Sequence, residues 1–358
     1  MENLANLKKF YKNKRVFITG HTGFKGTWLS IILSYLEAKI YGYSLKPNKV
    51  SLFKISKIEK KFSSSKYADI TKLNDFEKSI KKCNPEIVFH LAAQPLVIES
   101  YNNPLKTFNT NIIGTLHVLE CLRKIKSIKS VIIVTTDKVY KINKKNNNFK
   151  ELDQLGGNEP YSVSKVGTEI VTDCYIKSFF KNSKLKNKVS IVRAGNVIGG
   201  GDFSKNRLVP DILKAINNKK KLKIRNPYHI RPWQHVLDPL IGYLILAKKQ
   251  YFNNINTNNE FAWNFGPQKN NFKKVVDIVK YIQKFEKFNY VFDKKKKLKE
   301  TATLKLDSTK AKKKLNWICK WNLSVALKKT LEWNRSVRNR TSPENKCVQQ
   351  FLMYINNK

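Results

Sequence analysis

The sequence predicts an α/β protein built on a Rossmann-type, doubly wound parallel sheet with a smaller C-terminal α/β domain. A glycine-spaced turn from Gly20 to Gly26 follows the apolar run Arg15–Ile18 and precedes an amphipathic run. This strand–turn–helix order is typical of a dinucleotide phosphate site, because glycines allow close backbone approach and the helix N-terminus offers free N–H groups. Apolar strands then alternate with helical segments through the first half of the chain, which indicates a parallel sheet covered on both faces.

Each expected element rests on its local pattern. Short continuous apolar runs indicate buried strands, and apolar residues at helical spacing indicate helices. In chain order we expect strands at 16–19, 39–44, 66–70, 86–91, 130–135, 188–193 and 261–266, and helices at 26–36, 76–82, 109–125, 161–180, 272–285 and 325–333.

The regular alternation breaks after Arg193, where a glycine-rich loop at 195–202 and an irregular segment at 231–236 follow. We therefore expect residues 1–192, with a returning segment at about 233–265, to form the nucleotide-binding domain. Residues 193–232 and 266–340 are expected to form a substrate-binding domain, and residues 341–358 a C-terminal tail.

Length and composition bound the class of protein. The 358 residues, 41% of them hydrophobic, suffice for one large or two modest domains. The five cysteines are scattered and no pair has metal-ligand spacing, so we expect a reduced, cytoplasmic protein without a metal. No run approaches the ~20 apolar residues of a membrane span, and the N-terminus lacks the basic-then-apolar order of a secretory signal.

The formal net charge of +44 would suit a nucleic acid or an anionic membrane. Lysine and asparagine are nevertheless abundant along the whole chain, and no separate basic module with a nucleic-acid-binding pattern stands out. We interpret the charge as compositional, with attraction of an anionic substrate as a side benefit, and expect no nucleic-acid or membrane partner.

Candidate cofactor contacts lie in the glycine turn and at the carboxyl ends of the predicted strands. They are Gly20, Thr22, Gly23, Phe24 and Gly26 in the turn, Asp69 and Ile70 where an adenine would lie, Leu91, Ala92, Ala93 and Gln94 after a buried strand, and Thr110 on the next helix. Asp69 is equally well explained as the cap of the helix that follows it. The second strand ends without the acid that often holds an NAD ribose, and Lys46 would tolerate a 2′-phosphate, so this position leaves NAD and NADP open.

Tyr161 and Lys165 are four residues apart and therefore share one face of a helix. A free tyrosine is a poor base at neutral pH, but a nearby ammonium favours the phenolate, and the lysine can also hold a ribose hydroxyl. Such a pair suits proton removal from an alcohol during hydride transfer to a nicotinamide. The same spacing arises by chance in lysine-rich chains, and the glycine turn upstream is what favours the catalytic interpretation.

Thr136, Asp137 and Lys138 end a buried strand on the same rim as the other candidates. Thr136 could hydrogen-bond a reacting sugar oxygen, Asp137 could protonate a leaving hydroxyl if burial raises its pKa, and Lys138 could act as a base if desolvated. The alternative is that Asp137 only caps a turn and Lys138 is solvated.

The irregular second half contributes candidate phosphate contacts. Arg231 and His235 could hold a substrate diphosphate, and Arg207 is a weaker candidate of the same kind. Asn196 could donate to a phosphate, or could simply belong to a turn. These four residues are the expected substrate contacts.

Taken together, these motifs resemble the extended short-chain dehydrogenase/reductase superfamily from about Lys14 to about Trp333, including the C-terminal strings 306–311 and 315–317. More narrowly, five strings are similar to those of CDP-glucose 4,6-dehydratases: 20–26, 42–45, 90–97, 193–202 and 230–236. These long strings are far more specific than the glycine turn alone.

The resemblance implies NAD as cofactor and an internal redox reaction on CDP-glucose. Hydride would leave sugar C4 as Tyr161 takes the hydroxyl proton, water would leave across C5 and C6 with Asp137 as the acid at the C6 hydroxyl, and hydride would return to C6. Dehydratases of the dTDP type carry Asp-Glu where this chain has Asp137-Lys138, so Lys138 becomes the candidate C5 base. The resemblance also implies a homodimer, or a dimer of dimers, through helices 109–125 and 161–180, and a place in deoxysugar biosynthesis for lipopolysaccharide O-antigen.

Two other functions stay open at this point. A nucleotide-sugar 4-epimerase or decarboxylase on the same fold would share Thr136, Tyr161 and Lys165 without needing the Asp137-Lys138 pair. A basic nucleic-acid-binding or scaffold protein that kept the fold would bind nucleic acid in a salt-dependent way and show no turnover.

Overall fold

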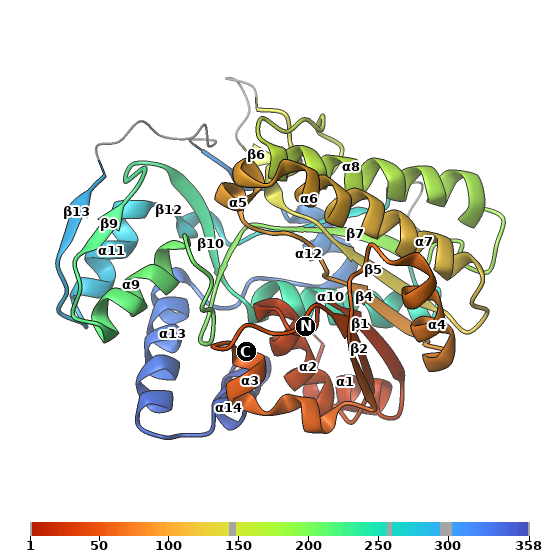
Figure 1. The fold of residues 1–358 in the computed structure, drawn as a ribbon, viewed down its shortest axis with the longest axis horizontal. Helices are drawn as coiled ribbons and strands as arrows, with labels where there is room; N and C mark the ends of the chain where they lie inside the picture. Colours follow the sequence, from red (N-terminus) through yellow and green to blue (C-terminus); the bar gives the residue numbers. More distant parts are fainter. Residues whose placement is uncertain (1, 143–147, 256–259, 294–302, 357–358) are drawn as a thin grey trace.

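A computed structural model of the chain describes residues 2–142, 148–255, 260–293 and 303–356. Its centre is a seven-stranded parallel sheet in the order β11-β7-β5-β4-β1-β2-β3, in which the order reverses between β1 and β4 (Figure 1). The strands are β1 (Arg15–Thr19), β2 (Lys39–Ser44), β3 (Ser64–Tyr67), β4 (Ile87–His90), β5 (Ser130–Val134), β7 (Val189–Ala194) and β11 (Ala262–Phe265). The predicted doubly wound parallel sheet is confirmed.

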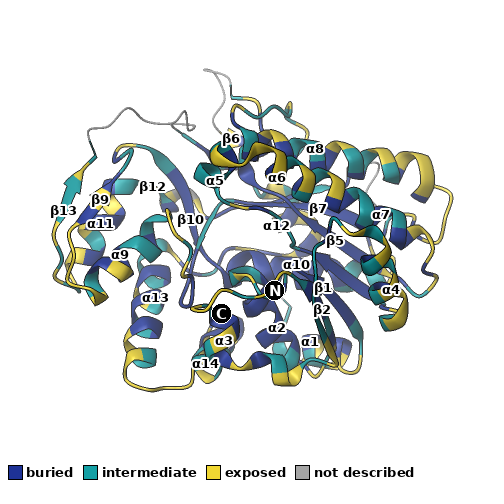
Figure 2. Ribbon diagram, viewed as in Figure 1, coloured by how far each residue is buried: buried dark blue, intermediate teal, exposed yellow. Residues whose placement is uncertain are grey.

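Alternate residues of the central strands enter two separate cores. Ile132 of β5 packs with the helices on one face, and its neighbour Ile133 packs with those on the other. The first face carries α1 (Leu4–Tyr11), α2 (Phe24–Tyr35) and α10 (Leu237–Tyr251); the second carries α4 (Leu73–Cys83), α7 (Gly114–Arg123) and α8 (Pro160–Tyr175). Because both faces are covered, the central strands β4, β5 and β7 are buried along their whole length, whereas the edge strand β3 is partly exposed (Figure 2).

A smaller lobe is built from the second half of the chain, on the left in Figure 1. Its elements are α9 (Leu208–Asn217), β9 (Leu222–Ile224), β10 (Ile230–His235), β12 (Phe272–Lys274), α11 (Val275–Gln283), β13 (Tyr290–Phe292) and α13 (Leu323–Arg338), packed around their own apolar core. β10 pairs with β8 (Asn196–Ile198) and antiparallel with β12, and β13 pairs with β9. β10 leads directly into α10, so the lobe connects back to the central sheet beside the carboxyl ends of its strands.

Short elements complete the chain. They are α3 (Leu52–Ser56), η1 (Ile58–Lys61), α5 (Val97–Asn102), α6 (Pro104–Phe108), η2 (Asn109–Ile113), η3 (Asp137–Val139), β6 (Asn148–Phe149), η4 (Ile176–Phe180), η5 (Lys269–Asn271), β14 (Lys305–Leu306) and α12 (Thr309–Leu315). β6 and β14 pair with each other next to the end of β11. Within the described ranges, no helix is long and apolar enough to cross a membrane.

The two long helices expected at 109–125 and 161–180 each contain a π-helical turn, η2 and η4. At η2 the cause is visible, because the carbonyl oxygen of Asn111 accepts the hydroxyls of Thr115 (2.6 Å) and Thr168 (2.8 Å). The carboxamide of Asn111 also bonds to Gln94 and Ser164. Side chains inserted into a helix ladder in this way are a usual cause of a π turn.

Further segments differ from the expected elements: the strand expected at 66–70 is β3 (Ser64–Tyr67), and the segment 231–236, expected to be irregular, lies almost entirely in strand β10. The helix expected at 272–285 begins only at Val275, because Phe272–Lys274 pair with β10 as strand β12. Residues 341–358, expected as a tail, contain helix α14 (Pro343–Asn356), whose buried face includes Phe351 and Tyr354 and packs against α2 and α3. Apolar residues at helical spacing in this segment explain why it folds onto the nucleotide-binding helix.

Candidate active site

The glycine turn joins β1 to α2 with the geometry that a phosphate site needs. Gly20 has φ +75°, and a Cβ there would lie 2.7 Å from the backbone nitrogen of Ala92. A Cβ at Gly26 would lie 2.2 Å from the carbonyl oxygen of Gly20. Gly23 is the N-cap of α2 and is exposed, and among the described residues no side chain caps this helix. The N–H groups of the first turn are therefore available to a pyrophosphate, so the turn fits a dinucleotide.

The end of β2 is neutral and already hydrogen-bonded. The hydroxyl of Thr22 bonds to that of Ser44 (2.8 Å) and donates to the carbonyl oxygen of Leu45 (3.0 Å). Phe24 lies half-buried in the first turn of α2. Asp69 follows β3 and accepts hydrogen bonds from both the backbone and the hydroxyl of Thr71 (2.9 Å each) through Oδ1. Asp69 thus stabilises the turn that precedes α4, as the alternative interpretation of this residue as a helix cap predicts. Its Oδ2 accepts no hydrogen bond from the described residues.

The other cofactor candidates surround the turn from the β4 side. Leu91 and Ala92 hydrogen-bond to Thr19, which fixes the loop against the glycine turn, and Ala93 continues it. Gln94 is buried, and its amide donates to Leu96 and Thr107. Ile70 packs against Gly114, and Thr110 lies half-buried in η2. Gln94 therefore supports the loop, rather than presenting a free side chain to a ligand.

Thr136, Asp137 and Lys138 lie at the carboxyl end of β5, as the sequence indicates. Asp137 is fully buried, and its Oδ1 accepts hydrogen bonds from the Thr136 hydroxyl (3.0 Å) and from Lys138 Nζ (2.9 Å). Its Oδ2 has no partner among the described residues. Lys138 Nζ also lies 3.4 Å from Oδ1 of Asn196. A buried carboxylate oxygen without a partner is costly, which is typical of a group kept ready for a ligand.

Tyr161 is placed by the start of α8. Pro160 occupies the first helical position, and the Glu159 carboxylate caps the helix by accepting from the backbone N–H of Tyr161 (2.8 Å) and of Ser162 (2.9 Å). The same N–H of Tyr161 also donates to the Ser100 hydroxyl at 3.1 Å. These contacts fix the first turn of the helix at the rim of the sheet.

The expected effect of Lys165 on Tyr161 is not visible in the hydrogen bonding. Lys165 Nζ donates to the carbonyl oxygen of Val134 at 2.9 Å. Burial raises the pKa of Tyr161 to about 12, with a hydrogen bond from Thr136 and the charge of Arg207 acting in the opposite direction. Burial also lowers the pKa of Lys165 to about 8. In this state Tyr161 is protonated, so a further positive charge is needed to make it a base.

Lys25, inside the glycine motif, is a residue that sequence reasoning did not single out. Burial lowers the pKa of its ammonium to about 7, and the charges of Arg207, Lys165 and Lys138 act in the same direction, opposed by Asp137. Its Nζ lies 5.8 Å from the ring centre of Tyr243. The charges of Arg207, Lys165, Lys138 and Asp137 therefore all reach Lys25, and Asp202 pairs with Arg207 in the same cluster.

The substrate candidates separate in the structure. Asn196 faces Lys138, and Arg207 pairs with Asp202 (3.2 Å) while its charge reaches Tyr161. Arg231 is buried in β10, where its guanidinium donates to the carbonyl oxygen of Ile230 and bonds to Nδ1 of His229. Asn196 and Arg207 therefore lie at the site, whereas Arg231 is held within its own strand and loop.

The expected contact of His235 with a substrate stays a prediction, and the structure shows how its ring is held. Its ring is fully buried between Trp28 (5.8 Å between ring centres) and Trp321 (4.8 Å). Nδ1 accepts from the backbone of Leu237, and Nε2 has no partner among the described residues. His235 therefore belongs to the packing between the central domain and the smaller lobe.

The glycine-rich loop at 199–201 serves packing in the same region. A Cβ at Gly200 would lie 2.0 Å from the Trp333 ring, and the carbonyl oxygen of Gly200 accepts from the indole of Trp28 (2.9 Å). Gly201 has φ +82° and lies against Leu52. These glycines allow two tryptophans to approach the backbone. This packing accounts for the glycines of the segment 199–201 without any contact to a ligand.

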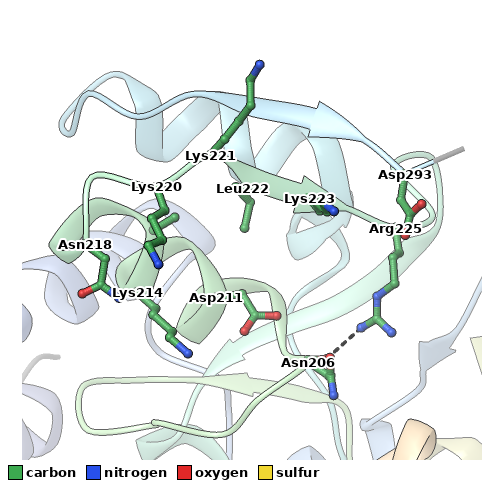
Figure 3. Close-up of a pocket in the computed structure, with 11 residues that line it drawn as sticks. Asn206, Asp211, Lys214, Asn218, Lys220, Lys221, Leu222, Lys223, Arg225 and Asp293 are labelled. Atoms are coloured by element: carbon green, nitrogen blue, oxygen red, sulfur yellow. Dashed lines mark hydrogen bonds between the residues drawn. The ribbon is translucent and has the colours of Figure 1, made fainter.

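A basic hollow of about 360 Å³ lies on the smaller lobe between α9, β9 and β13 (Figure 3). It is lined by Asn206, Asp211, Lys214, Ala215, Asn218, Lys220, Lys221, Leu222, Lys223, Arg225 and Asp293. Arg225 points across it to the carbonyl oxygen of Asn206, at 3.1 Å. Asn206, which lines the hollow, directly precedes Arg207 in the chain. Within the described ranges, no group of three or more His, Cys, Asp or Glu side chains could hold a metal ion.

Fold and site together define a class: a dinucleotide-binding α/β protein with the Tyr-x-x-x-Lys helix of the extended short-chain dehydrogenase/reductases. A profile of the GDP-mannose 4,6-dehydratase family matches residues 17–330. The chain belongs to this family.

Individual relatives agree with the assignment. The chain is 41% identical over 338 residues to a CDP-glucose 4,6-dehydratase of Salmonella typhimurium, covering 92% of each chain. Among solved structures, it resembles the dTDP-glucose 4,6-dehydratase of Bacillus anthracis in complex with NAD, with a TM-score of 0.75, 22% identity and coverage of 92% of this chain and 99% of the other. It also resembles a UDP-glucose 4-epimerase of Thermotoga maritima, with a TM-score of 0.75, 23% identity and coverage of 90% and 99%.

Proposed function

We propose that the protein is an NAD-dependent CDP-glucose 4,6-dehydratase, which converts CDP-glucose to CDP-4-dehydro-6-deoxyglucose and water. The observation that carries the proposal is the Asp137–Lys138 pair beside Thr136 and Tyr161, with one buried oxygen of Asp137 left without a partner among the described residues. An epimerase needs no acid and base for elimination at this position. The 41% identity to a CDP-glucose 4,6-dehydratase over most of both chains supports the choice of substrate.

The glycine turn and the free N-terminus of α2 would hold the pyrophosphate of NAD, and Lys165 would hold its nicotinamide ribose. When bound, NAD+ would supply a hydride acceptor at C4 of the sugar, a hydride donor at C6 and a positive charge near Tyr161. A positive charge at this place lowers the pKa of a buried phenol, which is the change that Tyr161 requires.

The side chains of the protein would then carry out the proton transfers. Tyr161 would take the proton of the C4 hydroxyl, with Thr136 holding the same oxygen. Asp137 would give a proton to the C6 hydroxyl, which leaves as water, and Lys138 would take the proton from C5. Asp137 would carry its proton on Oδ2, because Oδ1 already accepts from Lys138 and Thr136, and Lys138 would start as the neutral amine. The proton count of the pair is unchanged by the step, because Lys138 gains the proton that Asp137 loses.

The anionic part of the substrate would lie towards the smaller lobe. Asn196 and Arg207 are the candidate contacts for the diphosphate because they lie next to Lys138 and Tyr161. The basic hollow begins at Asn206 and would extend this positive surface towards the nucleoside. Arg231 is buried, so we propose an indirect role in which it supports the wall of the substrate site.

We also propose a homodimer formed by α7 and α8 with η2 and η4. The exposed apolar side chains Ile113, Val163, Ile170 and Phe179 all lie on these elements. Apolar side chains gathered on adjacent helices are typical of an interface. A cytoplasmic location and a place in deoxysugar biosynthesis, including that of O-antigen, would follow from the proposed reaction.

The direct test is turnover of CDP-glucose with NAD+ and structural analysis of the product. A 4-keto-6-deoxy sugar supports the proposal. A sugar epimerised at C4 would replace it with the epimerase function. Loss of carbon dioxide from a nucleotide-uronic acid supplied in a parallel incubation, with no turnover of CDP-glucose, would replace it with the decarboxylase function.

A further inference from the structure

A buried ion pair lies directly behind the catalytic segment. Glu169 of α8 and Arg193 of β7 are 2% and 3% exposed by side chain. Arg193 Nε donates to both carboxylate oxygens of Glu169, at 2.9 and 3.1 Å, and its Nη2 donates to Oε2. Neither residue was among the candidates from the sequence, although Glu169 continues the face of α8 that carries Tyr161 and Lys165 at four-residue spacing.

Glu169 holds the start of the catalytic segment. The hydroxyl of Thr135 donates to Glu169 Oε1 at 2.6 Å, and Thr135 directly precedes Thr136. One turn earlier on the same helix, Lys165 donates to the carbonyl oxygen of Val134. Lys165 and Glu169, one helical turn apart on α8, therefore bind the consecutive residues Val134 and Thr135 at the end of β5. These two contacts fix the position of Tyr161 relative to Asp137 along the axis of α8.

Arg193 holds the end of the same segment. Its Nη1 donates to the hydroxyl of Tyr140 (2.8 Å) and to the carbonyl oxygen of Glu151 (2.9 Å). Tyr140 directly follows η3, which contains Asp137 and Lys138, and its hydroxyl donates to Asn264 at 2.7 Å. The ion pair thus binds the chain immediately before and immediately after the four residues 136–139.

We propose that Glu169 and Arg193 form a positioning pair that sets the acid and base, Asp137 and Lys138, against Tyr161. A buried ion pair is often no more stabilising than apolar residues of the same size, so its distinctive contribution is geometric. A displacement of about 1 Å in a catalytic group can cost about 100-fold in rate. The inference rests on the proposed roles of these three catalytic residues.

The test removes single hydroxyls rather than the charges, so that folding is preserved. Thr135→Val removes the link to Glu169, and Tyr140→Phe removes the link to Arg193. Each should lower kcat about 10- to 100-fold while KM for CDP-glucose stays unchanged. Tyr251→Phe is the matched control, because the Tyr251 hydroxyl also bonds to a carboxylate, that of Glu86, at the opposite edge of the sheet (2.8 Å).

The decisive readout is the fraction of bound nicotinamide that is reduced during turnover. Oxidation at C4 depends on Tyr161, whereas elimination depends on Asp137 and Lys138. Displacement of the segment should slow elimination more than oxidation, so reduced nicotinamide should accumulate in both variants and not in Tyr251→Phe. A second variant, Glu169→Leu/Arg193→Met, should show the same accumulation with a larger loss of kcat.

Two results would overturn the proposal: unchanged kcat in the single variants, or a loss of kcat that follows the folded fraction with no rise in reduced nicotinamide. The wild-type enzyme distinguishes this failure from that of the proposed function. If the wild type forms neither product nor reduced nicotinamide with CDP-glucose, the assignment of the reaction fails and the positioning role fails with it.

Discussion

Lys138 contacts Asp137 through one carboxylate oxygen only: Nζ lies 2.9 Å from Oδ1, while the buried Oδ2 accepts no hydrogen bond from the described residues. The two residues therefore form an ion pair in which only one of the two carboxylate oxygens is hydrogen-bonded. Oδ1 is held by Lys138 and Thr136, which leaves Oδ2 as the oxygen able to meet a substrate hydroxyl. This arrangement separates the roles of the two residues and makes each of them testable.

Replacing Lys138 by Met should leave C4 oxidation intact and slow the exchange of the C5 hydrogen with deuterated water by about 10²- to 10⁴-fold, the usual contribution of a general base. The measurement is mass spectrometry of the sugar after incubation in deuterated water, with reduced nicotinamide followed in parallel. Exchange at the wild-type rate would remove Lys138 as the C5 base. Lys141→Met, which removes an exposed charge three residues further along the chain, is the control for loss of charge alone.

Replacing His235 by Phe should make the protein less sensitive to acid. Burial lowers the pKa of His235 to about 3, from 6.5 in an exposed histidine. Between these values the unfolded chain takes up a proton that the folded chain does not, so stability falls as pH drops from 6.5 towards 3. In the variant, the free energy of unfolding should fall less steeply with decreasing pH, by up to about 1.4 kcal/mol per pH unit. Denaturant unfolding across this pH range measures the slope. An unchanged slope would contradict the buried, neutral histidine; His117→Phe, a partly exposed site, is the control.

Phe351→Ala in α14 should cost about 3–5 kcal/mol in the free energy of unfolding, because the side chain is fully buried against the face of α2. Met353→Ala on the exposed side of the same helix should change it by no more than about 0.5 kcal/mol. Equal, small effects in urea denaturation would mean that residues 343–356 are a tail after all.

Ile170→Lys should convert the proposed dimer to a monomer, because it places a charge on the exposed apolar face of α8. Phe252→Lys changes a similarly exposed apolar residue next to α10 and should leave the dimer intact. Light scattering of both variants and of the wild type measures the mass directly. A monomeric wild type would remove the proposed dimer.

The sequence predicts those parts of the molecule that depend on local spacing. The turn at Gly20–Gly26 and the rim position of Thr136 follow from the order of strands and glycines, because the carboxyl ends of parallel strands meet at one edge. The four-residue spacing of Tyr161 and Lys165 places both on one face of α8, as expected.

Distant packing decides the features that the sequence does not predict. His235 looks like a ligand residue in an irregular string, but Trp28 and Trp321, both remote in sequence, enclose it. The π turn at η2 needs Thr168 from another helix. Glu169 and Arg193 become recognisable as partners only when α8 lies across β7, although the spacing of Glu169 from Lys165 marks it as part of the same face.

The most direct test is to incubate the purified protein with NAD+ and CDP-, dTDP-, GDP- or UDP-glucose in parallel, and to measure the 4-keto-6-deoxy sugar by its absorbance in alkali. We predict product with CDP-glucose and none, or far less, with the other three. Product with a different nucleotide would contradict the assigned substrate. No product with any of the four would contradict the dehydratase assignment and the acid–base roles of Asp137 and Lys138.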